Sequence, residues 1–304
     1  MAQPRLADYA MLLFLGVIWG SSFLFIGVAL EGLPPITLAA SRCLIGAVVL
    51  LAAVHVMGHA IPRDPRAWLS YLAMGLTNSA LPFILISMGQ TRIESSLAAI
   101  LIATVPLFTL LFGHLFTDDK ATPRKIAGTL IGFGGIVLLV GPAALAGLTA
   151  GLVGQIMIVG AAICFAITQI LIKRHRGGTP VVNAACSVAC SATWTLPLAL
   201  LLEHPWQAEP SWVGVGALLA LGIFSTGISH LVFFMLIRST GPSFVTLNNF
   251  ISPPVGLIWG ILLLGERPSW PIFAALAVIL IGIWVATRPG ARSPVPAPAR
   301  AAVP

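Results

Sequence analysis

The side chains best suited to chemistry lie inside long apolar stretches, and several of them recur at a fixed displacement along the chain. Shifts of 147 or 146 residues relate four pairs, which are Asn78 with Ser225, Ser79 with Thr226, Phe83 with His230, and Phe165 with Trp19. Amide and hydroxyl groups can hold the ammonium and carboxylate of a zwitterion, while aromatic rings cover its side chain. The pattern therefore predicts a small-molecule binding site with two related halves.

Four further polar residues in apolar stretches extend this candidate site, and they are Ser22, Gln169, Asn248 and Asn249. Thr226 and His230 are four residues apart and so share one face of a helix. The same groups can instead join helices through hydrogen bonds of about 0.6 kcal/mol each, and this alternative stays open. His230 can carry a proton near neutral pH, or it can pack as an uncharged side chain.

Arg42 also lies within an apolar stretch. Its position is about 9 Å inside the predicted helix, since each residue adds 1.5 Å. At this depth the side chain can snorkel to the outer membrane interface as an anchor, or it can contact a substrate carboxylate. The sequence does not decide between these roles.

Proline and glycine suggest where helices bend and approach one another. Pro106 and the Pro253–Pro254 pair stand at matched positions, and proline removes a backbone hydrogen bond inside a helix. Matched interruptions predict hinges near a binding region, with a static kink as the alternative. Three Gly-x-x-x-Gly motifs, which favour close helix packing within the chain, begin at Gly16, Gly128 and Gly256.

Other chemistries lack the residues that they need. All nine acidic residues lie in loops or near predicted helix ends, whereas proton-driven carriers normally keep a carboxylate inside the membrane. The four cysteines have no His or carboxylate neighbours at ligand spacing, so we expect no metal and no cofactor. An embedded enzyme would need a catalytic constellation at depth, a phosphate-ester carrier would need cations in its cavity, and a channel would need a filter or a charged ring.

Membrane-spanning helices must position these residues. Of the 304 residues 58% are apolar and only 8% are charged, with a mean hydropathy of +1.00, whereas soluble domains are about 25% charged. A bilayer core about 30 Å thick requires about 20 helical residues. Ten runs of this kind predict an all-α polytopic membrane protein, and they cover 9–29, 36–57, 67–89, 94–114, 123–140, 152–173, 181–202, 211–236, 242–263 and 269–288.

The distribution of Lys and Arg predicts the orientation. Thirteen of them fall on one side of the predicted topology, and only Arg92 and Arg267 fall on the other. Because positively charged loops stay in the cytoplasm, both termini are predicted to be cytoplasmic, which agrees with an even number of spans. Topology thus accounts for the net charge of +7, and we expect no binding to nucleic acid.

The recurring residues predict an internal duplication. Residues 1–140 form a first five-helix repeat, residues 141–288 form a second, and residues 289–304 form a disordered cytoplasmic tail. Five spans are an odd number, so the second repeat enters the membrane from the opposite side. Inverted repeats are common in alternating-access carriers, whose substrate site lies near the midplane between the halves.

Several motifs together resemble the EamA-type drug/metabolite transporters. They are Trp19-Gly20-Ser21-Ser22-Phe23, Arg42 in the second span, Pro106 in the fourth, and Gly265-Glu266-Arg267-Pro268 before the tenth. Over residues 6–288 the chain most resembles the YddG-type amino-acid exporters. The resemblance implies a bacterial inner-membrane carrier with a central cavity lined by spans 1, 3, 4, 6, 8 and 9. Many relatives carry Lys near the end of the first span, where this chain has Gly27.

The resulting hypothesis is a transporter, and specifically an exporter, of amino acids, including aromatic and other neutral ones. It would work by alternating access as a monomer in the lipid bilayer, without proton coupling. A nucleotide-sugar or other metabolite or drug carrier is the alternative, and an embedded enzyme is a remote one. The particular amino acids, the direction of transport and the coupling are not determined by the sequence.

Overall fold

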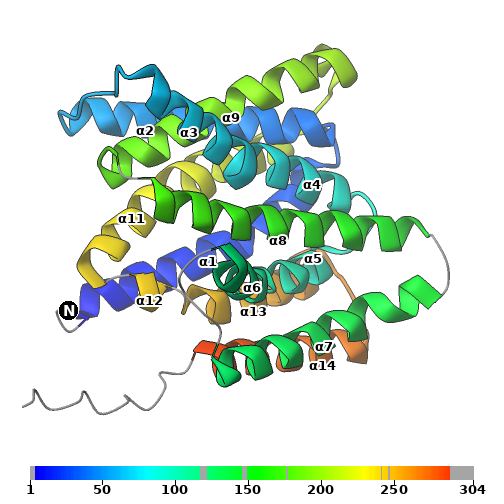
Figure 1. Cartoon of the computed structure of the whole chain (residues 1–304). Coiled ribbons are helices and arrows are strands. Elements are labelled where there is room, and N and C mark those ends of the chain that lie inside the picture. Colours follow the sequence, from blue (N-terminus) through cyan, green and yellow to red (C-terminus); the bar gives the residue numbers. More distant parts are fainter. Residues whose placement is uncertain are drawn as a thin grey trace, which may run out of the picture.

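The computed structural model describes residues 4–116, 122–145, 149–175, 177–240, 242–245 and 247–287. Within these residues all regular structure is helical, and no strand is present. The long helices run back and forth across the molecule, as Figure 1 shows. The prediction of an all-α fold is confirmed. The tail predicted at residues 289–304 lies outside the described residues.

The helices follow the predicted spans within a few residues. The part of the chain up to residue 145 contains α1 (Leu6–Ala29), α2 (Pro35–Val56), α3 (Pro65–Gly75), the π-helical η1 (Leu76–Ala80), α4 (Leu81–Gln90), α5 (Ser95–Ile102), α6 (Val105–Phe116) and α7 (Pro123–Leu145). The part from residue 150 contains α8 (Ala150–Arg174), α9 (Pro180–Leu202), the 3₁₀-helical η2 (Pro205–Gln207), α10 (Trp212–Ala220), the π-helical η3 (Leu221–Ile228), α11 (Ser229–Thr240), α12 (Pro242–Val245), α13 (Asn248–Leu263) and α14 (Trp270–Thr287).

Proline residues and hydroxyl caps mark where several helices begin. Pro35, Pro123 and Pro180 occupy the first helical position, where a missing N–H breaks no intrahelical bond. Thr149 and Ser211 precede α8 and α10, and their hydroxyl oxygens each accept a backbone N–H from the first turn. These local signals explain why the predicted boundaries agree with the structure.

Nine helical stretches among the described residues are long and apolar enough to cross a membrane. The shorter α13 makes a tenth crossing with α12 before it. Its first residue, Asn248, faces Gly16 in the first half of α1, whereas Gly260 faces Ser96 at the start of α5. The described chain therefore crosses the bundle ten times, in agreement with the predicted polytopic fold.

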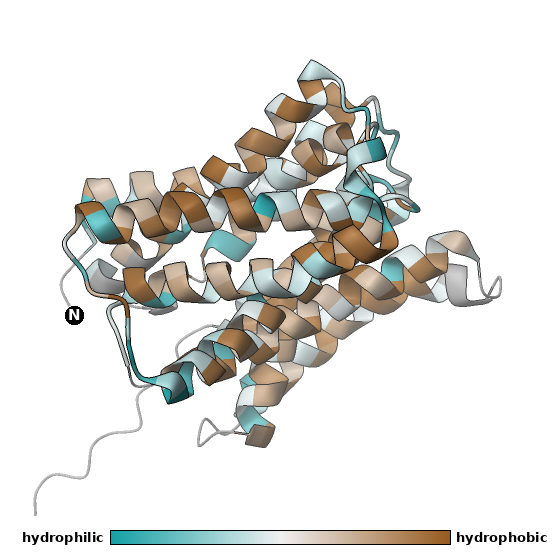
Figure 2. Ribbon diagram, turned by 90° about the horizontal axis from the view of Figure 1, so that it is seen from above, coloured by the Kyte–Doolittle hydropathy of each residue, from teal (hydrophilic) through white to brown (hydrophobic). Residues whose placement is uncertain are grey.

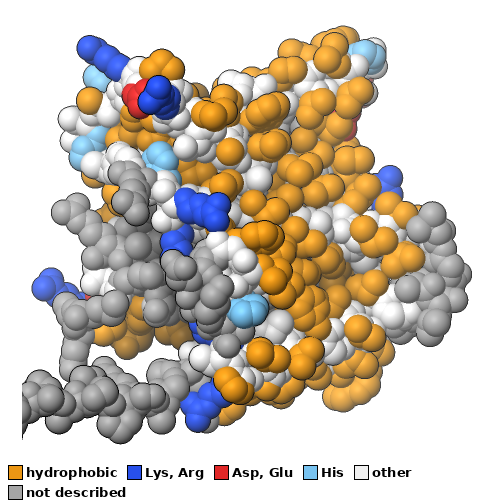
Figure 3. Space-filling model, viewed as in Figure 1, with side chains coloured by type: hydrophobic (Ala, Val, Ile, Leu, Met, Phe, Trp, Pro, Cys, Tyr) orange, Lys and Arg blue, Asp and Glu red, His pale blue; other side chains and the backbone are white. Residues whose placement is uncertain are grey.

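The outer surface is apolar along the helices and polar at their ends. Figure 2 shows brown helix faces with teal concentrated near the loops, and Figure 3 shows a broad apolar surface. Most of the blue Lys and Arg side chains in Figure 3 lie on the side where α1 begins. The end of α14 lies on this same side in Figure 1. Charge is therefore concentrated on the side that carries both ends of the described chain.

Glycine residues let helices of the chain approach closely. A side chain at Gly128 would overlap the backbone of α14, and one at Gly282 would overlap the backbone of α7. Gly20 lies equally close to α13, and Gly256 lies close to Ala99 of α5. All three predicted Gly-x-x-x-Gly motifs therefore pack against other helices of the same chain.

The contacts between helices correspond in the two halves of the chain. α2 packs on α9, and α7 packs on α14, so these contacts join equivalent helices. α1 packs on α13, and the equivalent contacts of the other half join α8 with α5 and α6. α4 packs on α8, and α10 and α11 pack on α1 in the equivalent way. Two related halves would produce this correspondence.

The fourth and ninth spans differ in where they are interrupted. α5 ends at Ile102 and α6 begins at Val105, so the break lies just before Pro106, as predicted. α13 continues through Pro253 and Pro254, so the interruption predicted there is wrong. Each proline removes one backbone donor, but α1 and α5 both pack against α13 and support the helix.

Candidate functional site

Two π-helical turns occupy equivalent positions in the third and eighth spans. A shift of 147 residues carries η1 onto residues 223–227, which lie within η3. A π turn contains an extra residue, and such turns are frequent at functional sites. The two turns carry four of the predicted site residues, Asn78, Ser79, Ser225 and Thr226. The sequence pattern predicted these residues but not the widened backbone that carries them.

Arg42 of α2 lies between the spans that contain the two turns. Its Nε donates a hydrogen bond to Thr226 Oγ1 at 2.8 Å, and its guanidinium carbon lies 3.8 Å from the centre of the Phe83 ring. Only 6% of the side chain is exposed. The interpretation of Arg42 as a snorkelling anchor is therefore wrong, because the side chain finds a hydroxyl acceptor and an aromatic face inside the bundle.

Trp19 of α1 meets the eighth span from another direction. Its Nε1 donates to Ser229 Oγ at 3.0 Å, and the Ser229 hydroxyl donates to the carbonyl of Ser225 at 2.8 Å. The Trp19 ring also lies edge-on to His230, with 6.5 Å between the ring centres. The structure thus brings Trp19, Ser225 and His230 together at one helix junction.

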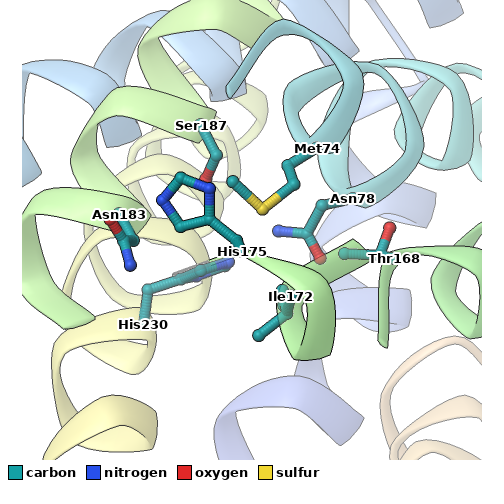
Figure 4. A pocket seen from close by; sticks show the side chains of 8 residues that line it. All are labelled: Met74, Asn78, Thr168, Ile172, His175, Asn183, Ser187 and His230. Carbon is teal, nitrogen blue, oxygen red and sulfur yellow. The ribbon is translucent and has the colours of Figure 1, made fainter. Parts of the chain in front are cut away.

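A small cavity of about 40 Å³ lies beside the π turns. Side chains from four spans line it and converge in Figure 4, and they are Met74, Asn78, Thr168, Ile172, His175, Asn183, Ser187 and His230. His175 and Asn183 flank the α8–α9 loop, so the cavity reaches that end of the bundle. One water needs about 10–15 Å³. The cavity therefore holds a few waters, and it must widen to admit an amino acid.

Several polar atoms at the cavity are available to a ligand. His230 Nδ1 and His175 Nε2 are buried and have no hydrogen-bond partner among the described residues. The amide of Asn78 reaches only Ser79 Oγ, at 3.5 Å, which is at the limit for a hydrogen bond. Asn183 is engaged, because its Oδ1 accepts from the Tyr71 hydroxyl at 2.8 Å. Widening of the cavity would expose these ring nitrogens and the Asn78 amide to a small polar molecule.

The other predicted site residues do not line the cavity. Ser22 is buried and donates to a carbonyl of its own helix, and Phe165 packs among apolar side chains. Gln169 is exposed. Asn248 is buried, and its Oδ1 has no partner among the described residues, while Asn249 is partly buried.

Much of the cavity lining was not predicted from the sequence. Thr168 lines the cavity where Gln169 was expected, because one residue turns the side chain by about 100° around a helix. A signal was present, since the shift of 146 residues pairs Thr168 with Ser22. No comparable signal marked the remaining lining residues, which are Met74, Ile172, His175, Asn183 and Ser187.

Two carboxylates close the opposite end of the bundle. Glu203, just after α9, accepts the N–H groups of Ile36–Thr37 at 2.9 and 2.6 Å. Glu266, before α14, accepts the N–H groups of Ser95–Ser96 at 2.6 and 2.9 Å. Each carboxylate therefore caps the start of a helix from the other half of the chain. We name this the capped end, and we name the end with the α8–α9 loop the cavity end.

The fold and the site define a class of protein. The described chain is an apolar bundle with ten crossings and a polar cavity between spans, and no group of three His, Cys, Asp or Glu side chains within it could hold a metal. This arrangement is typical of a membrane transporter. The EamA-like transporter family matches the chain twice, over residues 7–141 and 152–288. The chain belongs to this family, and it is a multi-pass protein of the bacterial inner membrane.

Individual relatives agree with this assignment. The chain is 28% identical over 280 residues to the uncharacterized inner membrane transporter YedA of Escherichia coli K12. This alignment covers 92% of this chain and 90% of YedA. The chain is 27% identical over 281 residues to a probable terminal-alkyne amino-acid exporter of Streptantibioticus cattleyicolor, with 90% of each chain covered. A crystal structure with 22% identity superposes with a TM-score of 0.67 over 93% of this chain and 99% of that chain, which supports the fold.

Proposed function

We propose that the protein exports amino acids, including aromatic and other neutral ones. The observation that carries the proposal is the gathering of uncharged polar groups inside an apolar bundle, where Asn78 and His230 border a cavity beside the hydroxyls of η3. Such groups can bind both ends of a zwitterion. The relative that is named a probable amino-acid exporter gives further support.

The proposed mechanism is alternating access between two inverted repeats, residues 1–140 and 141–288. The matched π turns and the matched helix contacts support this division. Here the capped end is closed by Glu203 and Glu266, while the cavity reaches the other end. Transport would close the cavity end and open the capped end. Because of the positive-inside rule, the cavity end faces the cytoplasm in this proposal. Pro106, at the break between α5 and α6, stays a candidate hinge. Pro253 and Pro254 stay candidates because each removes a backbone donor, although α13 is continuous there.

The proposed transport is facilitated and is driven by the substrate gradient. The described carboxylates with assigned partners lie at helix ends, where Asp8 accepts from the Ser239 hydroxyl and where Glu203 and Glu266 cap helices. Proton-driven carriers normally place such a group deeper, as a relay. An imposed proton gradient should therefore not concentrate a neutral amino acid inside protein-containing liposomes. Accumulation that His230→Ala abolishes would make His230 a proton carrier and would overturn this part of the proposal.

Counterflow in liposomes tests the substrate class. Purified protein in vesicles loaded with unlabelled neutral amino acid should take up the labelled form transiently, whereas empty vesicles should not. The panel should contain aromatic and aliphatic amino acids, a nucleotide-sugar and a simple phosphate ester. Exchange of the phosphate ester without exchange of any amino acid would show that the proposed substrate class is wrong.

We also propose that the monomer is the functional unit. The three glycine motifs are occupied by contacts within the chain, so they are not available to join two copies. Counterflow should therefore persist at a reconstitution density of about one protein per vesicle. Loss of exchange on dilution would indicate that an oligomer is required.

A further inference from the structure

Arg42 is a buried cation whose described contacts include no carboxylate. Only 6% of its surface is exposed, and its guanidinium group contacts the Thr226 hydroxyl and the Phe83 ring. A cation inside a membrane bundle is expensive, and it usually marks a functional site or faces a counter-charge. A hydroxyl and an aromatic ring attract a cation but do not neutralise it. The position is thus prepared for a negative charge that the described residues do not supply.

The relation between the two halves identifies the residue that is equivalent to Arg42. Gly75 and Gly222 are equivalent residues of the two halves. Gly75 lies against Cys190 of α9, and Gly222 lies against Ile45 of α2, so Ile45 and Cys190 occupy equivalent positions. Equivalent residues of α2 and α9 are therefore 145 residues apart. The same shift relates Arg42 to Ser187.

The aromatic neighbour of Arg42, Phe83, also has an equivalent residue in the other half of the chain. A shift of 147 residues relates Phe83 to His230. Ser187 and His230 line the observed cavity, whereas Arg42 and Phe83 are packed together on the side of the capped end. Arg42 therefore stands where a pathway from the capped end would run if that end opened as the cavity end has.

We propose that Arg42 binds the carboxylate of the substrate when the pathway at the capped end is open. This inference rests on the proposed transport function, and it names the group on the substrate that the protein recognises. The guanidinium can offer two parallel N–H donors to a carboxylate. Its hydrogen bond to Thr226 occupies one donor in the present conformation, and the substrate would replace that contact.

The surroundings favour a carboxylate over a phosphate. One guanidinium matches the single charge of a carboxylate, whereas a phosphate monoester carries nearly two charges. The described neighbours on the π turn are neutral, because Ser225 and Thr226 supply only hydroxyls. A compound that keeps the side chain and the amine but lacks the carboxylate should therefore be a poor substrate.

The test compares phenylalanine, phenylalanine amide and 3-phenylpropanoate as ligands of the purified full-length protein. Binding is measured by thermal shift, and transport is measured in liposomes. For the wild type, the two carboxylates should bind and the amide should bind at least about tenfold more weakly. Arg42→Gln should lose about tenfold in affinity for the carboxylates while its weak binding of the amide is unchanged. Arg42→Lys should recover part of the loss, because lysine restores the positive charge but not the two parallel N–H donors.

A matched control separates recognition from folding. Arg92→Gln alters an exposed arginine near the capped end and should leave the preference for carboxylates unchanged. If Arg42→Gln does not fold, the ratio of carboxylate to amide affinity in Arg42→Lys decides, and an unchanged ratio overturns the inference. An unchanged ratio in folded Arg42→Gln, or a wild type that binds neither carboxylate, also overturns it.

The panel also separates this inference from the proposed function. Binding and transport of 3-phenylpropanoate that depend on Arg42, without transport of phenylalanine, would refute amino-acid export and support carboxylate recognition. Transport of phenylalanine with the same efficiency by wild type and Arg42→Gln would support amino-acid transport and refute the role of Arg42.

Discussion

The two ends of the bundle are joined by different kinds of contact between the halves of the chain. At the capped end, Glu203 and Glu266 each accept two backbone N–H groups of a helix from the other half. At the cavity end, the described contacts across the halves include single hydrogen bonds from the Tyr71 hydroxyl to Asn183, from the Ser239 hydroxyl to Asp8 and from the Arg174 guanidinium to the Phe116 carbonyl. Each carboxylate at the capped end therefore holds one helix start through two hydrogen bonds, whereas each of these contacts at the cavity end is a single bond.

The difference agrees with the position of the cavity, which reaches the end that has the single bonds. Each capping carboxylate binds a helix start through two hydrogen bonds, so both bonds must be lost before that helix is released. The contact between Tyr71 and Asn183 at the cavity end is one bond between two side chains, and it is lost when either side chain rotates. Changes at the capped end should therefore alter stability and conformation together, while changes at the cavity end should mainly alter ligand binding.

The largest expected effect concerns which compartment each end faces. In a variant whose four native cysteines are replaced, an impermeant thiol reagent added to intact cells should label Glu209→Cys and not Gly177→Cys. Both residues are exposed, the first near the capped end and the second in the α8–α9 loop. The opposite labelling pattern would overturn the topology and the inverted repeat. Permeabilised cells, in which both sites should react, provide the control.

Removal of a cap should weaken the capped end. Glu266→Ala leaves two backbone N–H groups at the start of α5 without their acceptor, so stability should fall by about 2 kcal/mol. Thermal unfolding in detergent measures the effect. The matched control is Glu94→Ala, since Glu94 is exposed and its side chain does not cap α5. Equal destabilisation by the two variants would contradict the role assigned to Glu266.

Loss of a polar group at the site should weaken substrate binding more than folding. Asn78→Ala and Ser225→Ala should each raise the KM for a neutral amino acid about three- to tenfold, because each removes one hydrogen bond. Asn248→Ala and Asn249→Ala test the ninth span in the same assay. Thr193→Ala is the control, since Thr193 is exposed on α9. A variant that lowers the amount of folded protein without changing KM would assign that residue a structural role.

The smallest effect is expected where α1 meets the eighth span. Trp19→Phe keeps an aromatic ring but removes the donor to Ser229 Oγ, and the loss should be about 1 kcal/mol of stability. Trp212→Phe is the control because Trp212 is 91% exposed. Thermal unfolding compares the two. If Trp19→Phe is as stable as Trp212→Phe, the indole hydrogen bond does not help to hold the junction.

The spans and the π-turn residues were predictable for different reasons. Long apolar runs bounded by Pro35, Pro123 or Pro180 predict helices because lipid cannot satisfy exposed backbone groups. Asn78 and Ser225 were found because duplication preserved polar groups at matched positions. The prediction failed for Pro253 and Pro254, where neighbouring helices support a continuous helix despite the lost donors.

The sequence by itself determined the membrane environment, the helices and the recurring polar residues, because these depend on composition, span length and local spacing. Only the tertiary structure decided the direction in which Arg42 points and the contacts that cap α2 and α5. It also decided that Thr168 and not Gln169 lines the cavity. These outcomes depend on contacts between residues far apart in the chain, and a linear pattern does not specify the rotation of one helix against another.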